Sequence, residues 1–200
     1  MFREKLNKIV QKIDLSEEEM SDMIGEVFSG KVTDAQVGAM MAALATKGET
    51  FEELAGAALA MRRKALRIQA SSAVVVDTCG TGGDAADTFN ISTTTAFVVA
   101  GAGVTVAKHG NRSISSQCGS ADLLETLGMK LDIAPEIVEE AVEEIGIGFL
   151  FAPVYHGAMK YAARARKELG IRSIFNMLGP LTNPAGANCQ LLGVYAPELT

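Results

Sequence analysis

Apolar residues in the first seventy positions recur with helical spacing. Two sets follow the i, i+3, i+4, i+7 pattern: Met20, Met23, Ile24, Val27 and Phe28, and then Val37, Met40, Met41 and Leu44. This spacing places apolar side chains on one face of an amphipathic helix. We therefore expect two helices with one buried face each, in which the methionines act as adaptable core filler.

Polar residues mark the ends of these helices. The capping-box pattern, a Ser or Thr followed three residues later by Glu or Gln, occurs at Ser16 to Glu19, Thr33 to Gln36 and Thr50 to Glu53. Gly30 and Gly48 stand where the second and third helices should end. With a first helix over 2–13 and a fourth over 51–68, the pattern predicts a small helical domain covering residues 1–70.

From residue 71 onward, short β-branched runs alternate with helical segments. Strands are predicted at 72–76, 104–107, 148–151 and 191–195, and helices at 92–100, 121–127, 136–145 and 156–169, followed by a loop at 176–184. Alternation of this kind predicts a mainly parallel sheet with helices packed on it. The second domain is therefore an α/β domain over residues 71–200.

A glycine-rich segment follows the first predicted strand. It reads DTCGTGGD at residues 77–84, and the next helix begins near Ser92. A strand, a glycine loop and a helix start together expose backbone N–H groups to an anion. Asp84 adds a carboxylate, which suits a phosphate that arrives with a divalent cation. The segment matches neither the dinucleotide fingerprint nor the Walker loop, and a plain glycine turn is the alternative interpretation.

A second polar loop follows the second predicted strand, where open α/β sheets bind ligands. Lys108 and Arg112 bring two positive charges and His109 a titratable ring. Neutral donors accompany them at Asn111, Ser113, Ser115, Ser116 and Ser120. Each residue by itself has an ordinary structural explanation, but the combination suits a ligand with more than one phosphate.

Composition narrows the class of protein. The net charge of −6 disfavours a protein that binds duplex nucleic acid. We find no signal peptide and no apolar run that could span a bilayer, so we expect a soluble, cytoplasmic protein. Cys79, Cys118 and Cys189 lack metal-ligand spacing and suit reduced thiols; Cys79 has no obvious base beside it that would make it a nucleophile.

The sequence contains no Ser-His-Asp order, paired carboxylates or cysteine metal site. This absence favours chemistry that depends on positioning and charge neutralisation. Expulsion of pyrophosphate through a cationic sugar transition state fits, with Mg²⁺ stabilising the leaving group.

Four ordered motifs carry a family resemblance: DTCGTGGD at 77–84, TFNIST at 88–93, KHGNRS at 108–113 and FNMLGPLTNP at 175–184. The chain resembles the anthranilate phosphoribosyltransferase family over its whole length. The resemblance implies Mg²⁺-dependent transfer of phosphoribosyl from phosphoribosyl pyrophosphate to the amine of anthranilate, in tryptophan biosynthesis. It also implies a helical domain beside an α/β domain of the nucleoside phosphorylase type, and a homodimer joined through the helical part.

The resemblance assigns site residues by position. Contacts to phosphoribosyl pyrophosphate fall on Gly80, Gly82, Gly83, Asp84, Thr88, Asn90, Ile91, Ser92, Thr93, Lys108, His109, Gly110, Asn111, Arg112, Ser113, Ile114, Ser115, Ser116 and Ser120. Contacts to anthranilate fall on Gly80, Asn111 and Arg166, of which Arg166 pairs with the carboxylate. Ser92 also reaches the magnesium ion, while His109 and His156 line the channel for the aromatic acid. No protein base is expected, because the amine of anthranilate can attack the ribose directly.

The chain departs from the family's pattern in two ways. Gly157 and Arg164 stand where the family often has proline, and Arg164 could compete with Arg166 for the carboxylate. Family members also run well past residue 200, and their acidic magnesium-binding pair lies in that later part. We therefore expect an N-terminal part of such an enzyme, truncated at its C-terminus and inactive alone.

Three alternatives stay open. A pyrimidine nucleoside phosphorylase shares the architecture but differs in the loop after His109. A non-catalytic relative that binds nucleic acid is disfavoured by the acidic charge. The third interpretation, a degenerate regulatory or assembly fragment, is supported only by the expected truncation of the chain.

Overall fold

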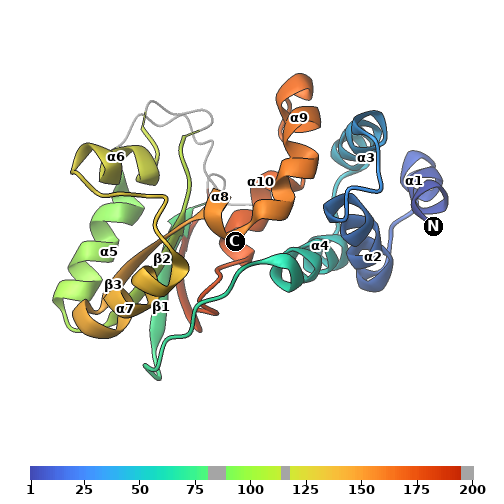
Figure 1. The fold of residues 1–200 in the computed structure, drawn as a ribbon. Helices are drawn as coiled ribbons and strands as arrows, with labels where there is room; N and C mark the ends of the chain where they lie inside the picture. Colours follow the sequence, from blue (N-terminus) through green and yellow to red (C-terminus); the bar gives the residue numbers. More distant parts are fainter. Residues whose placement is uncertain (81–88, 114–117, 195–200) are drawn as a thin grey trace. The chain divides into compact units, whose positions relative to one another are not determined.

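The computed structural model describes residues 1–80, 89–113 and 118–194. The chain forms two compact units (Figure 1). Unit 1 comprises 1–65 and 156–182, and unit 2 comprises 66–155 and 183–200. We describe each unit by itself.

Unit 1 is helical. Its elements are α1 (Phe2–Val10), α2 (Glu17–Phe28), α3 (Asp34–Lys47), α4 (Phe51–Lys64), the 3₁₀ turn η1 (Gly157–Met159), α9 (Lys160–Leu169), α10 (Phe175–Leu178) and η2 (Gly179–Leu181). All three predicted capping boxes are present, at the N-termini of α2, α3 and α4. The prediction was wrong at the end of α4, which stops at Lys64 because Ala65 adopts an extended conformation.

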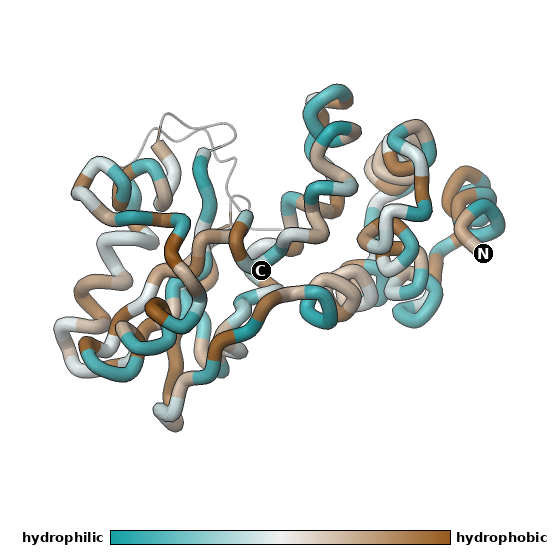
Figure 2. Tube along the Cα trace, viewed as in Figure 1, coloured by the Kyte–Doolittle hydropathy of each residue, from teal (hydrophilic) through white to brown (hydrophobic). Residues whose placement is uncertain are grey.

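The core of unit 1 is rich in methionine, as predicted. Met20, Met23, Met40 and Met41 are each at most 1% exposed. The buried positions lie on the apolar faces that Figure 2 shows in brown along the helices. Helix α4 approaches α2 closely at Gly56, where an added Cβ would lie 2.2 Å from the carbonyl oxygen of Glu17.

Residues 156–182 belong to the compact helical unit. Their apolar side chains join its core, namely Ala162, Ala165, Ile174, Phe175 and Leu178. From sequence, these residues were assigned to the domain that follows residue 70. The difference arises because apolar spacing shows that a helix has a buried face but not which neighbour covers it. The domain boundary at residue 70 stays a prediction. The expected helix over 156–169 is divided between η1 and α9, and the expected loop at 176–184 contains α10 and η2.

Unit 2 contains a four-stranded sheet in the order β3-β2-β1-β4. The strands are β1 (Val75–Gly80), β2 (Thr105–Gly110), β3 (Ile147–Phe151) and β4 (Cys189–Gly193); the helices are α5 (Ile91–Gly101), α6 (Ser120–Thr126), α7 (Pro135–Ile145) and α8 (Ala152–Tyr155). Every described strand pair is parallel, which confirms the predicted sheet.

Strand β1 is displaced from its predicted range. It begins at Val75 and continues through Cys79 and Gly80, which were assigned to the glycine loop. The cause is β4, which pairs with β1 from Val76 to Gly80. Pairing with a strand more than one hundred residues away is not visible in local sequence.

Helices cover both faces of the sheet (Figure 1). On one face, Val138 and Val142 of α7 pack with Ala107 and Leu150. On the other, Phe149 packs with Ala121 and Leu124 of α6, and α5 is joined to β1 by the Thr78 hydroxyl, which donates to the Ser92 carbonyl at 2.7 Å. No helix within the described ranges is long and apolar enough to cross a bilayer.

A buried carboxylate joins three segments of unit 1. Glu53 is fully buried; its Oε1 accepts from the backbone N–H of Leu15 at 3.0 Å and its Oε2 accepts from Lys47 Nζ at 3.0 Å. The same Oε2 accepts from the backbone N–H of Thr50 at 3.0 Å. Burial lowers the pKa of Lys47, but hydrogen bonds to Asp14 and Glu53 outweigh this effect and leave the pKa raised.

We predict that Glu53→Ala lowers the free energy of unfolding by about 3 kcal/mol, because it leaves Lys47 and two backbone donors without their buried acceptor. Urea unfolding followed by circular dichroism measures this loss. Glu52→Ala, at the neighbouring exposed position, is the control and should change stability by no more than about 0.5 kcal/mol. Equal effects of the two substitutions would show that the buried carboxylate has no special role.

Candidate functional site

The carboxyl ends of β1 and β2 carry the polar residues that the sequence singled out. Backbone pairing of these two strands covers Val75 with Thr105 and Val76 with Val106. Beyond those pairs, two side chains connect the strands. The backbone N–H of His109 donates to Asp77 Oδ1 at 3.1 Å, and Lys108 Nζ donates to the carbonyl oxygen of Thr78.

Lys108 is buried, at 3% exposed. Its ammonium also donates to Ser92 Oγ at 3.2 Å. Burial lowers the pKa of Lys108, and the negative charge of Asp77 opposes that shift. The structure therefore brings Lys108 and Ser92, two predicted phosphate ligands, into direct contact at the start of α5.

Helix α5 begins one position before Ser92, with Asn90 as its N-cap residue. The Asn90 side chain makes no capping bond and instead accepts from the Thr93 hydroxyl at 2.7 Å. The N-terminus of a helix presents backbone donors and a positive dipole end to an anion. Asn90, Ser92 and Thr93 thus lie together at an anion-favouring position, with Ile91 exposed between them.

The second loop is held by carboxylates. Arg112 forms ion pairs with Asp122 at 3.1 Å and Glu125 at 2.7 Å. Asp122 also accepts from the backbone N–H groups of Ser113 and Gly119, both at 2.9 Å. These backbone donors, followed by Arg112, lower the pKa of Asp122. Arg112 is thus engaged within the protein at the position where a phosphate contact was predicted.

Glycines and a carbonyl shape the same loop. A Cβ on Gly110 would lie 2.4 Å from Ser120 Oγ, and one on Gly119 would lie 2.3 Å from the backbone nitrogen of Ser113. The Asn111 carbonyl accepts from the Ala121 N–H at 3.2 Å and from the Ser120 hydroxyl at 3.3 Å. Gly119 therefore packs against backbone atoms, which leaves no space for a Cβ, whereas at Gly110 a Cβ would meet the Ser120 and Phe149 side chains.

Cys79 is unsuited to nucleophilic chemistry. It lies in β1, where burial and then the charge of Asp77 raise the pKa of its thiol to about 12. The thiolate is the reactive form of cysteine, so this environment agrees with the expectation that Cys79 is no nucleophile.

Several predicted ligands lie outside the described residues, namely Gly82, Gly83, Asp84, Thr88, Ile114, Ser115 and Ser116. Within the described ranges, no three Cys, His, Asp or Glu side chains gather closely enough to hold a metal ion. Among the described residues, the Ser92 hydroxyl is the predicted magnesium ligand; Asp84, whose carboxylate was expected to accompany a divalent cation, lies outside them.

The predicted anthranilate ligands are divided between the units, with Arg166 in unit 1 and Gly80 and Asn111 in unit 2. The guanidinium of Arg166 lies 5.6 Å from the centroid of the Phe175 ring, and burial lowers its pKa. Arg164 is exposed and pairs with Glu168 at 2.8 Å and Asp34 at 3.7 Å. Among the described residues, no carboxylate forms an ion pair with Arg166, which favours Arg166 over Arg164 as an anion partner.

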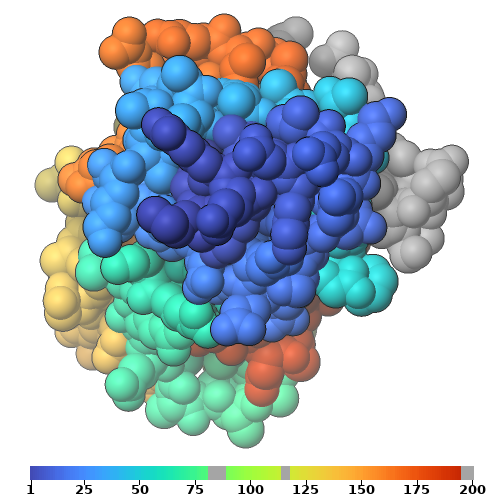
Figure 3. Space-filling view, turned by 90° about the vertical axis from the view of Figure 1, so that its right-hand side faces the viewer, coloured from blue at the N-terminus to red at the C-terminus, as the bar shows by residue number. Residues whose placement is uncertain are grey.

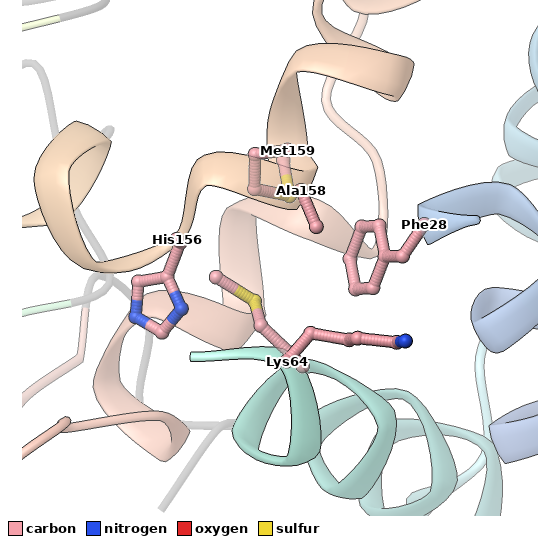
Figure 4. A pocket seen from close by; sticks show the side chains of 6 residues that line it. Phe28, Lys64, His156, Ala158 and Met159 are labelled. Atoms are coloured by element: carbon pink, nitrogen blue, oxygen red, sulfur yellow. The ribbon is translucent and has the colours of Figure 1, made fainter. Parts of the chain in front are cut away.

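His156 lies in a small pocket of unit 1 (Figure 4). Its walls come from α2, the end of α4 and η1, and consist of Phe28, Met61, Lys64, Ala158 and Met159. The pocket is mostly apolar with one lysine at its rim, and it has no room for a water molecule.

Sequence reasoning did not assign Asp77 or Asp122 to the site. Asp77 is fully buried at the end of a strand, and Asp122 connects both ends of the second loop. For Asp77, the sequence did contain a hint: its carboxylate directly follows an apolar strand run. A buried acid almost always has a specific partner.

Two family descriptions match the chain. A glycosyl transferase family α/β domain matches residues 72–200, and the helical bundle domain of a glycosyl transferase family matches residues 3–65. The chain is 75% identical over 200 residues to an anthranilate phosphoribosyltransferase of Desulfosudis oleivorans and 74% identical to that of Syntrophobacter fumaroxidans. These matches cover all of this chain and 59% of each relative.

Two solved structures have the same fold as this chain. The anthranilate phosphoribosyltransferase of Thermus thermophilus has a TM-score of 0.92 at 47% identity, covering 97% of this chain and 59% of that one. The enzyme of Saccharomyces cerevisiae in complex with PRPP and Mg has a TM-score of 0.89 at 31% identity, covering 99% of this chain and 59% of that one. The chain thus spans about 59% of the length of these relatives. The resemblance expected from the four motifs is confirmed, and the chain belongs to the glycosyl transferase family whose α/β domain matches residues 72–200.

Proposed function

We propose that this chain supplies the donor-binding part of an anthranilate phosphoribosyltransferase. The reaction transfers phosphoribosyl from phosphoribosyl pyrophosphate to the amine of anthranilate and releases pyrophosphate, in tryptophan biosynthesis. The observation that carries the proposal is the junction of Lys108, Ser92 and the N-terminus of α5. A cation, a hydroxyl and the backbone donors of a helix start together suit a diphosphate, which supports the proposal.

The chemistry needs little beyond positioning. The nitrogen of anthranilate forms a bond to C1 of the ribose, the bond from C1 to the pyrophosphate oxygen breaks with its electron pair, and the amine loses a proton to solvent. Lys108 and the start of α5 would hold the leaving pyrophosphate and stabilise its developing charge. Magnesium supplies further charge neutralisation when bound, and Ser92 would be its ligand among the described residues.

Arg166 is proposed to bind the carboxylate of anthranilate. Its partly buried guanidinium has the Phe175 ring as its neighbour, whereas the two ion pairs of Arg164 occupy that side chain. Gly80 and Asn111, which belong to unit 2, stay predicted contacts to anthranilate. A yeast relative of known structure binds 4-fluoroanthranilate, at a TM-score of 0.84 and 30% identity, which supports this acceptor.

We further propose a cytoplasmic homodimer joined through the helical unit. Helices α1 and α2, in dark and medium blue, form much of the surface that faces the viewer in Figure 3. Exposed apolar side chains in this unit include Val10, Ile13 and Phe51, at 64%, 48% and 78% exposed. A contiguous patch of exposed apolar side chains favours association, so the proposal predicts that these residues are covered in the dimer.

The proposal is tested by calorimetric titration of phosphoribosyl pyrophosphate with MgCl₂ into the 200-residue chain. Turnover is tested in a chimera, in which this chain replaces the matched 200 residues of the Desulfosudis oleivorans relative. We expect donor binding by both proteins and formation of phosphoribosyl anthranilate by the chimera. A chimera that is folded but neither binds the donor nor turns over would overturn the proposed function.

Lys108→Ala should weaken donor binding by about a hundredfold, because it removes a buried cation that faces the phosphates. Titration of phosphoribosyl pyrophosphate with Mg²⁺ measures the loss. Lys130→Ala, at an exposed position of the same unit, is the matched control and should bind as the unsubstituted protein does. Unchanged affinity of the Lys108 variant would remove this lysine from the site.

Arg166→Ala in the chimera should raise the KM for anthranilate at least about tenfold and leave the KM for phosphoribosyl pyrophosphate within about twofold. Steady-state kinetics with each substrate varied in turn measures both constants. Arg164→Ala should leave both constants near their starting values. The reverse result would assign the carboxylate to Arg164.

A further inference from the structure

The parallel ladder between β1 and β2 ends before either strand does. Both strands have six residues, but their pairing stops at Val76 and Val106. In contrast, β4 pairs with β1 as far as Gly80, and β3 pairs with β2 as far as Gly110. The two central strands, β1 and β2, therefore do not pair with each other at their carboxyl ends, although each still pairs with its outer neighbour.

Two reciprocal side-chain bonds replace the missing ladder. Asp77 reaches from β1 to the backbone N–H of His109 on β2. Lys108 reaches from β2 to the carbonyl of Thr78 on β1. Each strand thus contributes one side chain and one backbone group, so the spacing of the strand ends depends on both bonds.

Asp77 lies in a buried environment, where its Oδ1 accepts from the His109 N–H. It is 0% exposed, and burial raises its pKa, against the opposing effects of the Asn183 amide, the His109 N–H and the charge of Lys108. Asn183 itself donates to the carbonyl of Ala107 on β2 at 2.7 Å. Asp77 and Asn183 together therefore set the position of the last half of β2, which carries Lys108.

We propose that Asp77 is a positioning residue for the phosphate site, acting through the His109 backbone and Lys108. By holding the ends of β1 and β2 at a fixed spacing, it directs Lys108 toward Ser92 and the start of α5. This inference rests on the proposed function, because it assigns Asp77 to binding of the phosphoribosyl pyrophosphate donor and not of the acceptor.

The test compares three substitutions in the chimera. Asp77→Ala should raise the KM for phosphoribosyl pyrophosphate about tenfold or more, with the KM for anthranilate within about twofold. Asp77→Asn should recover most of this loss, because its amide oxygen can still accept from the His109 N–H. Asn188→Ala is the matched control, since Asn188 accepts from the Val75 N–H at 2.9 Å at the opposite end of β1; it should leave the KM for the donor unchanged.

Two results would overturn the proposal. One is an equal rise of both KM values in Asp77→Ala; the other is an equal effect of Asn188→Ala on the donor. Either would mean that Asp77 supports only the general stability of the sheet.

A measurement without ligand separates this proposal from the proposed function. In the unsubstituted 200-residue chain, the His109 amide should exchange with solvent deuterium at least about a hundredfold more slowly than the exposed Lys130 amide, and Asp77→Asn should preserve most of this protection. Slow exchange with no donor binding would refute the proposed function while leaving the Asp77 bridge intact. Fast exchange at His109 in the unsubstituted chain would refute the bridge, whether or not Asp77→Ala folds.

Discussion

The ammonium group of Lys108 is buried at the carboxyl end of the sheet, and the local structure depends on compensating that burial. Removing a charge from water costs several kcal/mol unless partners replace the lost hydration. The partners here are the Thr78 carbonyl, the Ser92 hydroxyl and the charge of Asp77. Since they come from β1 and α5, the lysine ties a strand and a helix start to β2. These contacts hold the proposed phosphate ligands Lys108 and Ser92 together.

The cationic side chains of unit 2 differ in whether they form ion pairs within the protein. Lys108 has neutral partners within hydrogen-bond distance, and the charge of Asp77 acts on it without an ion pair at short range. Arg112 instead meets two carboxylates and helps to shape the second loop. In the helical unit, Arg164 likewise pairs with the carboxylates of Asp34 and Glu168, whereas among the described residues no carboxylate forms an ion pair with Arg166.

The helical unit follows a different principle, because its stability comes from apolar packing around one buried carboxylate. Methionines of α2, α3 and α4 belong to one apolar core, and Gly56 permits close approach of α4 to α2. Glu53 then joins the end of α3 and the start of α4 to the segment before α2. Segments that follow residue 155 complete this core, so the unit depends on residues far apart in the chain.

Sequence alone determined the features that depend on near neighbours. The three capping boxes, the apolar helix faces and the succession of parallel strands were all predicted, because each rests on spacings of two to four residues. The resemblance carried by the four motifs also predicted one site for Lys108, Ser92 and the loop glycines, of which the structure brings Lys108 and Ser92 into contact. Tertiary structure alone decided what depends on distant partners: β4 extended β1 into the predicted glycine loop, and the helices after His156 joined the N-terminal core. It also gave Asp77 its bridging position, since a buried carboxylate takes its role from the backbone group that a neighbouring strand presents to it.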